Sequence, residues 1–388
     1  MDSLGEANIK FTIDLFKHLR KPESNVFYSP VSIMSALAML LPGAAGDTAQ
    51  QIEEVGASIA SLTSWVLGSP PHCQLVENVH HQFQKLLTKL NKSSDAYDLK
   101  IANRIYAEKK FQLLQKYLED TQKFYRTNVE RLDFVNAAEE SRKKINSWVE
   151  SQTDEKIKDL FPMRTLDRQT VLVLVNAVYF KGLWNEKFEK KHTKEEKFWL
   201  NKDTSKPVQM MKQTNYFKLA FLEDVQATIL EMPYKGERLS MFVLLPNEVD
   251  GLQQLEDKLT AEKLIEWIKP QAMGEREVHL SIPRFKVEEN YDLKTVLGHM
   301  GIVDAFNPQK ADFSGISGGH DLVVSRVRHK SFVEVTEEGT EAAAATGVEI
   351  SLTSAPIVEY FSCDHPFLFF IKENETNNIL FFGRFFSP

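Results

Sequence analysis

The chain has 388 residues, of which 43% are hydrophobic and 26% are charged, and this balance is typical of a folded protein with a large buried core. It excludes a disordered chain. The formal net charge of -7 argues against a nucleic-acid partner, because phosphate binding requires a basic surface.

Neither a secretory signal nor a membrane span is expected. Met1–Phe16 combines acids and a lysine without a continuous apolar run. Val31–Leu41 is the most helix-like apolar stretch, and it is too short for a bilayer core of roughly 30 Å. The two cysteines, Cys73 and Cys363, imply no disulfide framework and favour a reducing compartment. We therefore expect a cytoplasmic protein, with the nucleus or release without a signal peptide as alternatives.

The first third of the chain reads as helices. Ala7–Leu19 has apolar residues at helical spacing, and Val31–Leu41 follows a Ser29-Pro30 pair that suits a helix start. Ala138–Leu160 is a third predicted helix. Its apolar side chains are spaced to share one face: Ile145, Trp148, Val149 and Ile157.

After Thr170 the pattern changes to strands. Val171–Phe180 is almost unbroken in its apolar character and rich in β-branched residues, which predicts a central strand buried on both faces. Further strands are predicted at Leu239–Leu245, Val278–Ile282, Ser331–Val335, Phe367–Ile371 and Ile379–Phe382, with a turn at Asn374–Asn378. No linker divides the chain, so we expect one α+β domain over 1–388.

Two groups of residues resemble catalytic or metal sites, and both are set aside. Gly315–Gly319 matches the Gly-x-Ser-x-Gly pattern around Ser317, but no buried strand precedes it and no helix follows it. We expect a glycine-rich turn and no enzyme. The possible ligands His72, Cys73, His80 and His81 lack the paired spacing of a zinc site, so we expect them at the surface and expect no cofactor and no metal.

The segment Val55–Pro71 carries two readings. It is apolar and rich in small residues, yet it closes on Gly68-Ser69-Pro70-Pro71. A short core helix and an exposed apolar loop remain equally open.

The segment 337–356 connects two predicted strands, yet its own sequence also has the pattern of a strand. Connections of this length are uncommon and usually functional. Its even positions are apolar, small or β-branched: Thr340, Ala342, Ala344, Thr346, Val348, Ile350 and Leu352. This alternation indicates a strand with one buried face, so we infer an exposed loop that can add itself to a sheet. An ordinary alanine-rich helix or linker is the alternative.

Four motifs together resemble the serpin family over essentially the whole chain. They are Asn25–Ile33 (Asn-Val-Phe-Tyr-Ser-Pro-Val-Ser-Ile), Val175–Trp184, the Glu-Glu-Gly-Thr-Glu-Ala run at Glu337–Ala342, and Asp364–Phe369. The Met-Asp-Ser-Leu start and the short end are similar to the ovalbumin-type intracellular clade. The stretch from Val79 to Ser151 is similar to the squamous-cell-carcinoma-antigen subgroup, which includes inhibitors of serine and of papain-like cysteine proteases.

The resemblance implies a serpin fold with three β-sheets, about nine helices and an exposed reactive-centre loop at 337–356. A target protease would cut the loop as a substrate, and the cut loop would then insert into the main sheet and trap the acyl-enzyme. The inhibitor would supply stored strain and no catalytic group.

The resemblance also carries roles over to individual residues. It assigns the hinge, where insertion starts, to Glu337, Gly339, Thr340, Glu341, Ala342, Ala343, Ala344, Ala345 and Thr346. It assigns the shutter, a hydrogen-bonded cluster beneath the main sheet, to Ser29, Ser32, Asn176 and His329. It assigns the breach, at the top of that sheet, to Trp184.

The resemblance implies a spacing of seventeen residues from the hinge acid to the reactive bond, and counting inclusively from Glu337 puts this bond at Thr353-Ser354, with Leu352-Thr353 as the alternate. The expected partner is a papain-like cysteine or chymotrypsin-like serine protease, and the protein is expected to be a monomer. A non-inhibitory serpin acting as carrier, chaperone or storage protein is the alternative. Pro42 and Arg328 depart from the residues usual in the family at these places.

Overall fold

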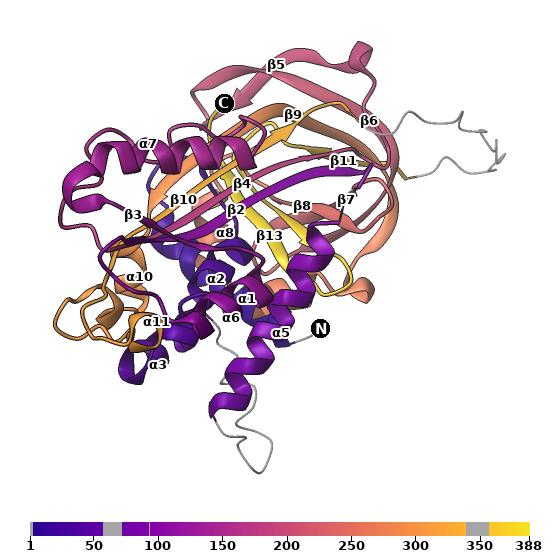
Figure 1. Ribbon diagram of the computed structural model, residues 1–388. Helices are drawn as coiled ribbons and strands as arrows, with labels where there is room; N and C mark the ends of the chain where they lie inside the picture. The colour runs from indigo at the N-terminus through magenta and orange to yellow at the C-terminus, as the bar shows by residue number, and fades with distance from the viewer. Residues whose placement is uncertain (1–2, 57–71, 93, 339–356) are drawn as a thin grey trace.

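The computed structural model describes residues 3–56, 72–92, 94–338 and 357–388. Ten α-helices lie in these ranges, and Figure 1 shows most of them gathered around one end of a strand-rich body. The helices are α1 Ser3–Leu19, α2 Pro30–Ala38, α3 Gly46–Gly56, α5 His72–Leu90, α6 Gln115–Tyr125, α7 Phe134–Gln152, α8 Leu252–Lys258, α9 Ala261–Trp267, α10 Lys294–Met300 and α11 Ser314–Ser317.

Thirteen strands are present in the same ranges. They are β1 Val26–Tyr28, β2 Tyr97–Glu108, β3 Val129–Leu132, β4 Leu172–Gly182, β5 Lys194–Trp199, β6 Ser205–Leu222, β7 Ala227–Pro233, β8 Leu239–Pro246, β9 Gly274–Asp292, β10 Val324–Val335, β11 Glu359–Ser362, β12 Phe367–Glu373 and β13 Ile379–Phe385. The expected sheets are joined by shared strands, because β9 pairs with β6 over 274–284 and with β10 over 285–292.

The main sheet has the order β9-β10-β4-β2-β3. Its central strand β4 is buried on both faces from Leu172 to Phe180, as the sequence predicted. Val173 and Val175 pack with α7, whereas Leu172 and Leu174 belong to the larger core on the opposite side. Figure 1 shows α7 lying along the outer face of this sheet.

The second strand-rich region, around β1, β8, β12 and β13, has a core that is rich in phenylalanine rings. Phe27 of β1 stacks against Phe369 of β12 and Phe381 of β13, with ring centroids 5.9 and 5.3 Å apart. Gly383 permits this packing, because a Cβ atom there would lie 2.5 Å from the Phe369 ring. The strands β8, β12 and β13 pair antiparallel and carry the turn predicted at 374–378 between the last two.

The predicted helix Ala138–Leu160 is wrong at both ends. Helix α7 starts at Phe134, capped by Asp133, whose carboxylate accepts the Asn136 N–H at 3.0 Å. Its backbone is kinked at Ala137, so a first turn precedes the predicted start. The helix stops at Gln152, and the next turns pass through residues with positive φ at 154 and 155, which end helical pairing.

The predicted helix Val31–Leu41 also ends early. Helix α2 runs over Pro30–Ala38, with Ser29 as its N-cap, and Leu41–Gly43 forms a separate 3₁₀ turn. Pro42 explains the change, because proline lacks an N–H and disfavours α-helical geometry in the residue before it.

The serine motif at 315–319 has a packing explanation. Gly315 lies on the one-turn helix α11, and a Cβ atom there would lie 2.9 Å from the Gly43 Cα and 3.0 Å from the Pro42 oxygen. The glycine therefore allows close approach to the 3₁₀ turn. Of Val55–Pro71, residues 57–71 lie outside the described ranges, so the two readings stand. Within those ranges, no helix has the length and apolar character needed to cross a membrane.

Candidate functional site

The centre of the main sheet contains a parallel ladder that is flanked by antiparallel ones. Strands β4 and β10 pair directly from Leu172 with Val324 to Phe180 with Val333, and we call this ladder the seam. The outer neighbours β2 and β9 both pair antiparallel to it. A strand entering the seam in the opposite direction would replace one parallel ladder by two antiparallel ladders, and antiparallel pairing is slightly more stable per residue.

A buried polar cluster lies at the middle of the seam. Asn176 of β4 and His329 of β10 are register partners, and the Asn176 amide oxygen is hydrogen-bonded to Nδ1 of His329. The Asn176 amide nitrogen donates to Oγ of Ser32 at 2.6 Å, and Ser29 N–H donates to Nε2 of His329 at 3.1 Å. The four residues assigned to the shutter are thus brought together beneath the sheet.

The hydrogen bonds of His329 fix its protonation state. Nε2 accepts from the Ser29 backbone, so the neutral ring carries its proton on Nδ1 and donates it to Asn176. The side chain is fully buried, and desolvation lowers the pKa of His329 to about 3. At neutral pH the cluster is uncharged and its polar atoms are paired, which a buried polar group requires.

Asn103 belongs to the same cluster and was not predicted. It is the register partner of Asn176 on β2, and its side-chain oxygen accepts from Ser32 Oγ at 3.2 Å and from the Asn176 amide. Asn176 therefore joins three strands, but only its bond to His329 crosses the seam.

Trp184 closes the upper end of the seam. Its ring nitrogen donates to the backbone carbonyl oxygen of Thr336 at 2.8 Å, and its backbone N–H donates to the backbone carbonyl oxygen of Glu338 at 3.2 Å. The indole stacks on Tyr234 with centroids 4.5 Å apart. The residue assigned to the breach thus ties the end of β4 to the segment that follows β10.

The side chains of two glutamates, Glu337 and Glu338, anchor the end of the described chain before the loop. Glu337 is buried, its carboxylate accepts from Thr193 Oγ1 at 2.8 Å, and it lies 3.5 Å from Arg284 Nη1. Glu338 pairs with Lys181 Nζ at 2.9 Å, and this hydrogen bond lowers the pKa of the Glu338 carboxyl. Contacts of Glu337 with Thr193 and Arg284, and of Glu338 with Lys181, thus hold the chain in place up to residue 338.

The loop and most of the hinge lie outside the described residues. These are the hinge residues Gly339, Thr340, Glu341, Ala342, Ala343, Ala344, Ala345 and Thr346, and the two candidate bonds at Leu352, Thr353 and Ser354. The described chain resumes at 357, and β11 then pairs parallel with β9.

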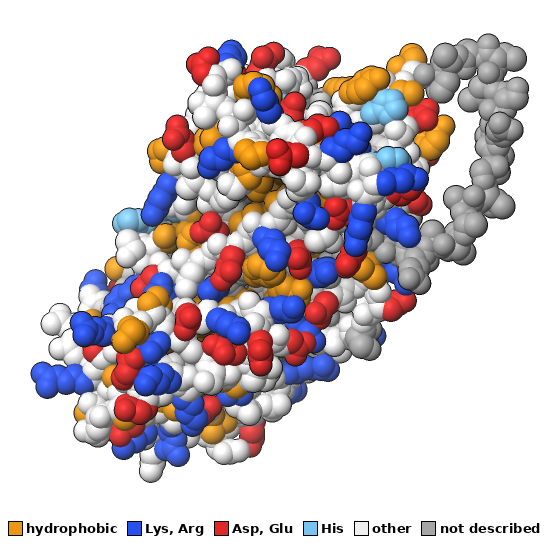
Figure 2. Space-filling model, turned by 90° about the horizontal axis from the view of Figure 1, so that it is seen from above, with side chains coloured by type: hydrophobic (Ala, Val, Ile, Leu, Met, Phe, Trp, Pro, Cys, Tyr) orange, Lys and Arg blue, Asp and Glu red, His pale blue; other side chains and the backbone are white. Residues whose placement is uncertain are grey.

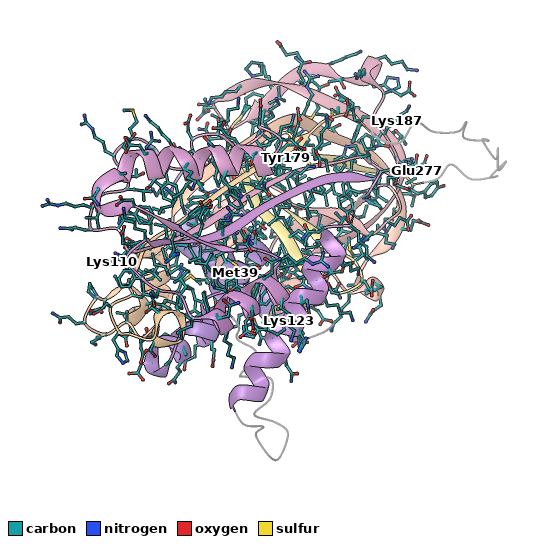
Figure 3. The ribbon with its side chains drawn as sticks, in the orientation of Figure 1. Met39, Lys110, Lys123, Tyr179, Lys187 and Glu277 are labelled. Carbon is teal, nitrogen blue, oxygen red and sulfur yellow. The ribbon has the colours of Figure 1, made fainter. Side chains whose placement is uncertain are left out.

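The connection that follows α7 lies over the seam. Lys330 Nζ donates to the Lys158 oxygen at 2.7 Å, so β10 is tied to this connection. The guanidinium of Arg328 lies 5.7 Å from the Phe161 ring centre, and burial lowers its pKa. Figure 3 labels Tyr179 of β4 beside the end of α7. Any strand that entered the seam would pass beneath this cover.

The surface prediction for the histidine group is wrong for His80. This side chain is buried, its Nδ1 is 2.5 Å from the Tyr125 hydroxyl, and burial lowers its pKa to about 4. The neighbouring His81 is exposed, as predicted. The side chains of His72 and Cys73 lie outside the description, and no metal-binding group of His, Cys, Asp or Glu occurs among the residues described.

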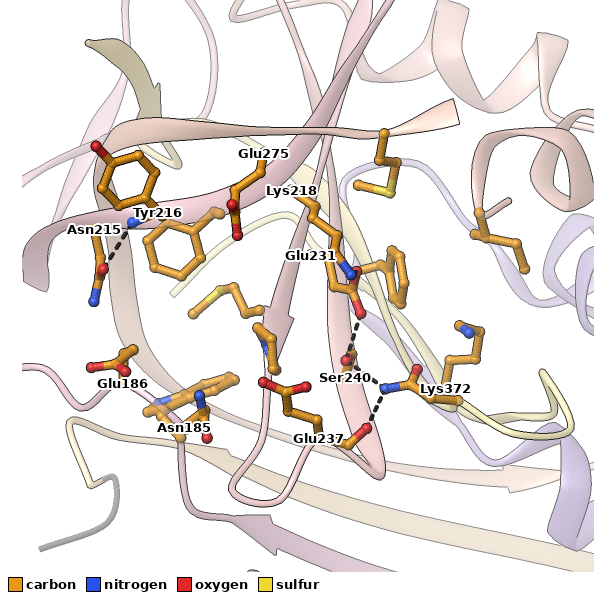
Figure 4. A pocket seen from close by; sticks show the side chains of 18 of the residues that line it. Asn185, Glu186, Asn215, Tyr216, Lys218, Glu231, Glu237, Ser240, Glu275 and Lys372 are labelled. Carbon is orange, nitrogen blue, oxygen red and sulfur yellow. Dashed lines mark hydrogen bonds and ion pairs between the residues drawn. The ribbon is translucent and has the colours of Figure 1, made fainter. Parts of the chain in front are cut away.

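A pocket of about 570 Å³ opens between β6, β7, β8, β12 and the end of α9 (Figure 4). Ser240 Oγ donates to Glu231 at 2.8 Å, and the Asn374 amide donates to Ser240 at 2.9 Å. Lys372 lines the same pocket and donates to Asn377 Oδ1 at 2.7 Å. Its burial lowers its pKa to about 8. This is a cavity of the size that holds small molecules.

The chain matches the family model described as Serpin (serine protease inhibitor) over residues 6–388. The protein belongs to the serpin family. It is 61% identical to human Serpin B4 and 60% identical to human Serpin B3, and both alignments cover 100% of each chain. It is also 46% identical to the horse leukocyte elastase inhibitor, again over 100% of both chains. The predicted resemblance to the ovalbumin-type clade and its squamous-cell-carcinoma-antigen subgroup is confirmed.

Solved structures agree with the fold. Uncleaved ovalbumin superposes with a TM-score of 0.89 at 40% identity, covering 100% of both chains. A loop-inserted, cleaved ovalbumin mutant gives a TM-score of 0.87 at 39% identity and the same coverage. Human thyroxine-binding globulin complexed with its hormone gives 0.86 at 30% identity, covering 99% of this chain and 98% of that one. The serpin fold is thereby confirmed.

Proposed function

We propose that this protein is an inhibitory serpin that traps a serine or papain-like cysteine protease as a suicide substrate. It works as one domain over 1–388, as a monomer in the cytoplasm, with 337–356 as its reactive loop. The observation that carries the proposal is the parallel seam closed over a buried polar shutter, because the strand β10 of this seam is followed in the chain by a segment whose sequence alternates like a strand.

The proposed mechanism uses the direction of the strands. The protease nucleophile bonds to the carbonyl carbon of Thr353, and the amine of Ser354 leaves with a proton, which forms an acyl-enzyme. The released loop follows β10 and folds back, so it enters antiparallel to both β4 and β10. The attached protease is pulled along and distorted before water can free it. The inhibitor contributes strain and geometry and no catalytic residue.

The composition of the hinge supports insertion. Thr340, Ala342 and Ala344 would face the interior in the inserted strand, and their small side chains need little room when the sheet opens. Charged or bulky residues at these positions would favour a non-inhibitory member of the family.

The sequence beside the bond selects the class of target. No basic residue lies between Gly339 and Pro356, so trypsin-like enzymes, whose pocket carries an acid, should be poor partners. Papain-like proteases often select an apolar residue just before the bond residue, and Leu352 takes that place for cleavage at Thr353-Ser354. Chymotrypsin-like enzymes would cut after Leu352.

A protease panel followed by a denaturing gel tests the function. A covalent band of higher mass with a papain-like or chymotrypsin-like protease is expected, and mass spectrometry of the released peptide should find Ser354 or Thr353 at its start. Cleavage without any covalent band across the panel would contradict the proposal. A peptide starting elsewhere would move the bond and leave the inhibitory mechanism intact.

A hinge variant separates inhibition from cleavage. Thr340→Arg places a charge where the loop must bury a side chain, and an unpaired buried charge is costly. We expect the variant to be cleaved as a substrate with loss of the covalent complex, whereas Thr340→Ser should keep it. An unchanged yield of complex with arginine would exclude insertion at this position.

A carrier is the second candidate, because of the pocket beside Lys372. Thyroxine-binding globulin, a relative of the same fold, is known in complex with a small hormone. A carrier would bind a small molecule with unchanged affinity after Thr340→Arg and would give no covalent band with any protease.

A further inference from the structure

Exposed apolar side chains gather beside the point where the chain resumes after the loop. Among the described residues, eight large hydrophobic side chains are exposed. Half of them lie on β6 or on the segment that starts at 357: Tyr216, Phe221, Ile357 and Tyr360. Figure 2 shows hydrophobic and histidine side chains together at this end, next to the grey atoms.

The strand register puts several of these side chains on one face. Tyr360 of β11 is the partner of His279 on β9, and His279 is the partner of Thr214 on β6. The Tyr360 and His279 rings lie 4.9 Å apart, and the Thr214 hydroxyl is hydrogen-bonded to His279. Tyr216 follows two residues after Thr214 and points to the same side. We call these four residues the Tyr360 face.

The Tyr360 face offers aromatic surface and hydrogen-bonding groups. Tyr360 is 80% exposed and Tyr216 is 59% exposed, so both rings are available to a partner. The nearby Lys212 is paired with Glu196 at 2.5 Å. A groove of about 810 Å³ runs along His279 and Tyr360. Tyrosines of this kind are enriched at the centres of protein interfaces because they bury area and retain a polar tip.

Chain length decides which partner reaches this face. Ser354 precedes Tyr360 by six residues, so the two are at most about 20 Å apart even in a fully extended chain. A protease of about 220 residues has a radius of roughly 20 Å. A protease bound at the proposed bond therefore has its own surface within reach of the Tyr360 face. On the other side Glu338 precedes Thr353 by fifteen residues, which allows about 50 Å.

We propose that the Tyr360 face is a second contact surface for the target protease, which holds the enzyme against β11, β9 and β6 before the loop is cut. This inference rests on the proposed inhibitory function. The face takes the protein surface beside the active-site cleft and adds affinity to the encounter. It has no part in loop insertion.

The test measures the encounter apart from the chemistry. Papain and chymotrypsin, each with its nucleophile replaced by alanine, are titrated against the intact protein and the double variant Tyr216→Ala/Tyr360→Ala. We expect the protease that forms the covalent complex, papain or chymotrypsin, to bind the double variant about tenfold more weakly than the intact protein, as for central interface tyrosines. With the active enzyme, complex formation should slow by a similar factor, while the ratio of inhibited to cleaved molecules stays unchanged. Val303→Ala, an exposed apolar residue outside this face, serves as the control.

The outcomes separate this inference from the proposed function. An unchanged affinity and an unchanged rate in the double variant overturn the Tyr360 face, even when a covalent band forms. Absence of the band with weakened binding in the variant overturns the inhibitory mechanism and keeps the contact surface. A wild-type dimer that becomes a monomer in the variant would assign the face to a second copy of this chain instead.

Discussion

The two strand-rich regions of the molecule are held together by different forces. The seam has a small polar cluster at its centre, where Asn176 and His329 are hydrogen-bonded. The region of β8, β12 and β13 is filled by rings such as Phe370 and Phe382. Opening the seam separates the stacked Tyr179 and Phe332 rings and breaks ladder hydrogen bonds that an entering strand can restore. Opening the aromatic region exposes a larger apolar surface that no entering strand covers. This difference supports the proposal that the seam is the place where the main sheet opens.

Loop cleavage should have the largest effect on this comparison. Cleavage frees the alternating segment 340–352 to enter the seam, which adds a full strand and buries one of its faces. We expect the melting temperature to rise by about 10 °C or more, since a chain of this length needs several kcal/mol for such a shift. Calorimetry of intact and cleaved protein measures it. Equal melting temperatures would contradict insertion into the seam.

Truncation in the aromatic region should destabilise both forms equally. Phe382 is fully buried, with its ring 5.0 Å from that of Phe16. Phe382→Ala is expected to cost about 3–5 kcal/mol, and Phe382→Leu clearly less. Urea unfolding of the intact and loop-cleaved forms gives the loss in each. A loss confined to the intact form would show that this region also rearranges.

Acid should weaken the protein through two buried histidines. The folded-state pKa is about 3 for His329 and about 4 for His80, against 6.5 for a free histidine. Unfolding therefore takes up protons below pH 6.5, and the stabilisation present above that pH is lost as pH falls. At pH 5 each histidine should cost about 2 kcal/mol. His80→Phe should remove half of this dependence in urea titrations at pH 5 and 7.5, and an unchanged dependence would contradict the burial of His80.

The sequence revealed the parts of the site that lie in continuous motifs. Asn176 and Ser29 each sit within a run typical of the family, and the structure brings them together. Asn103 has no such run, because its role arises from the β2–β4 register with a residue 73 positions away. His80 was misjudged for the same reason, since its partner Tyr125 lies on another helix, 45 residues further along.

The apolar periodicity around α7 predicted the buried face of the helix more accurately than the residue at which the helix ends. Ile157 has the spacing of Ile145 and Val149 and is buried in the same cluster, yet it follows the end of α7. A side chain in a turn can fill a position that continues the helical pattern. Backbone features such as the positive φ at 154 and 155 decide the end, and apolar spacing does not report them.

A pair of asparagine variants tests whether the seam-crossing bond matters most. Asn176→Ala leaves the buried Nδ1–H of His329 without its acceptor, which should cost about 1–3 kcal/mol. Asn103→Ala removes the acceptor of the Ser32 and Asn176 bonds on the β2 side of the seam and keeps the crossing bond. We expect Asn176→Ala to self-associate through its main sheet more readily than Asn103→Ala on mild heating. Size-exclusion chromatography measures the fraction of oligomers and aggregates. Equal behaviour of the two variants would contradict a special role for the crossing bond.

The smallest effect is expected at the outer hinge contact. Lys181 and Glu338 are both partly exposed, so their ion pair should contribute less than about 1 kcal/mol and should weaken with salt. Because the pKa of Glu338 is lowered, its contribution is present above the normal carboxyl pKa and is lost as pH falls below it. The Thr193 hydroxyl donates to the buried carboxylate of Glu337, and a buried acceptor that loses its donor is costly, so Thr193→Val should destabilise the intact form more than Lys181→Ala does. Melting in low and high salt compares the two variants. A larger, salt-sensitive loss for Lys181→Ala would mean that the chain is anchored at Glu338 and released there first.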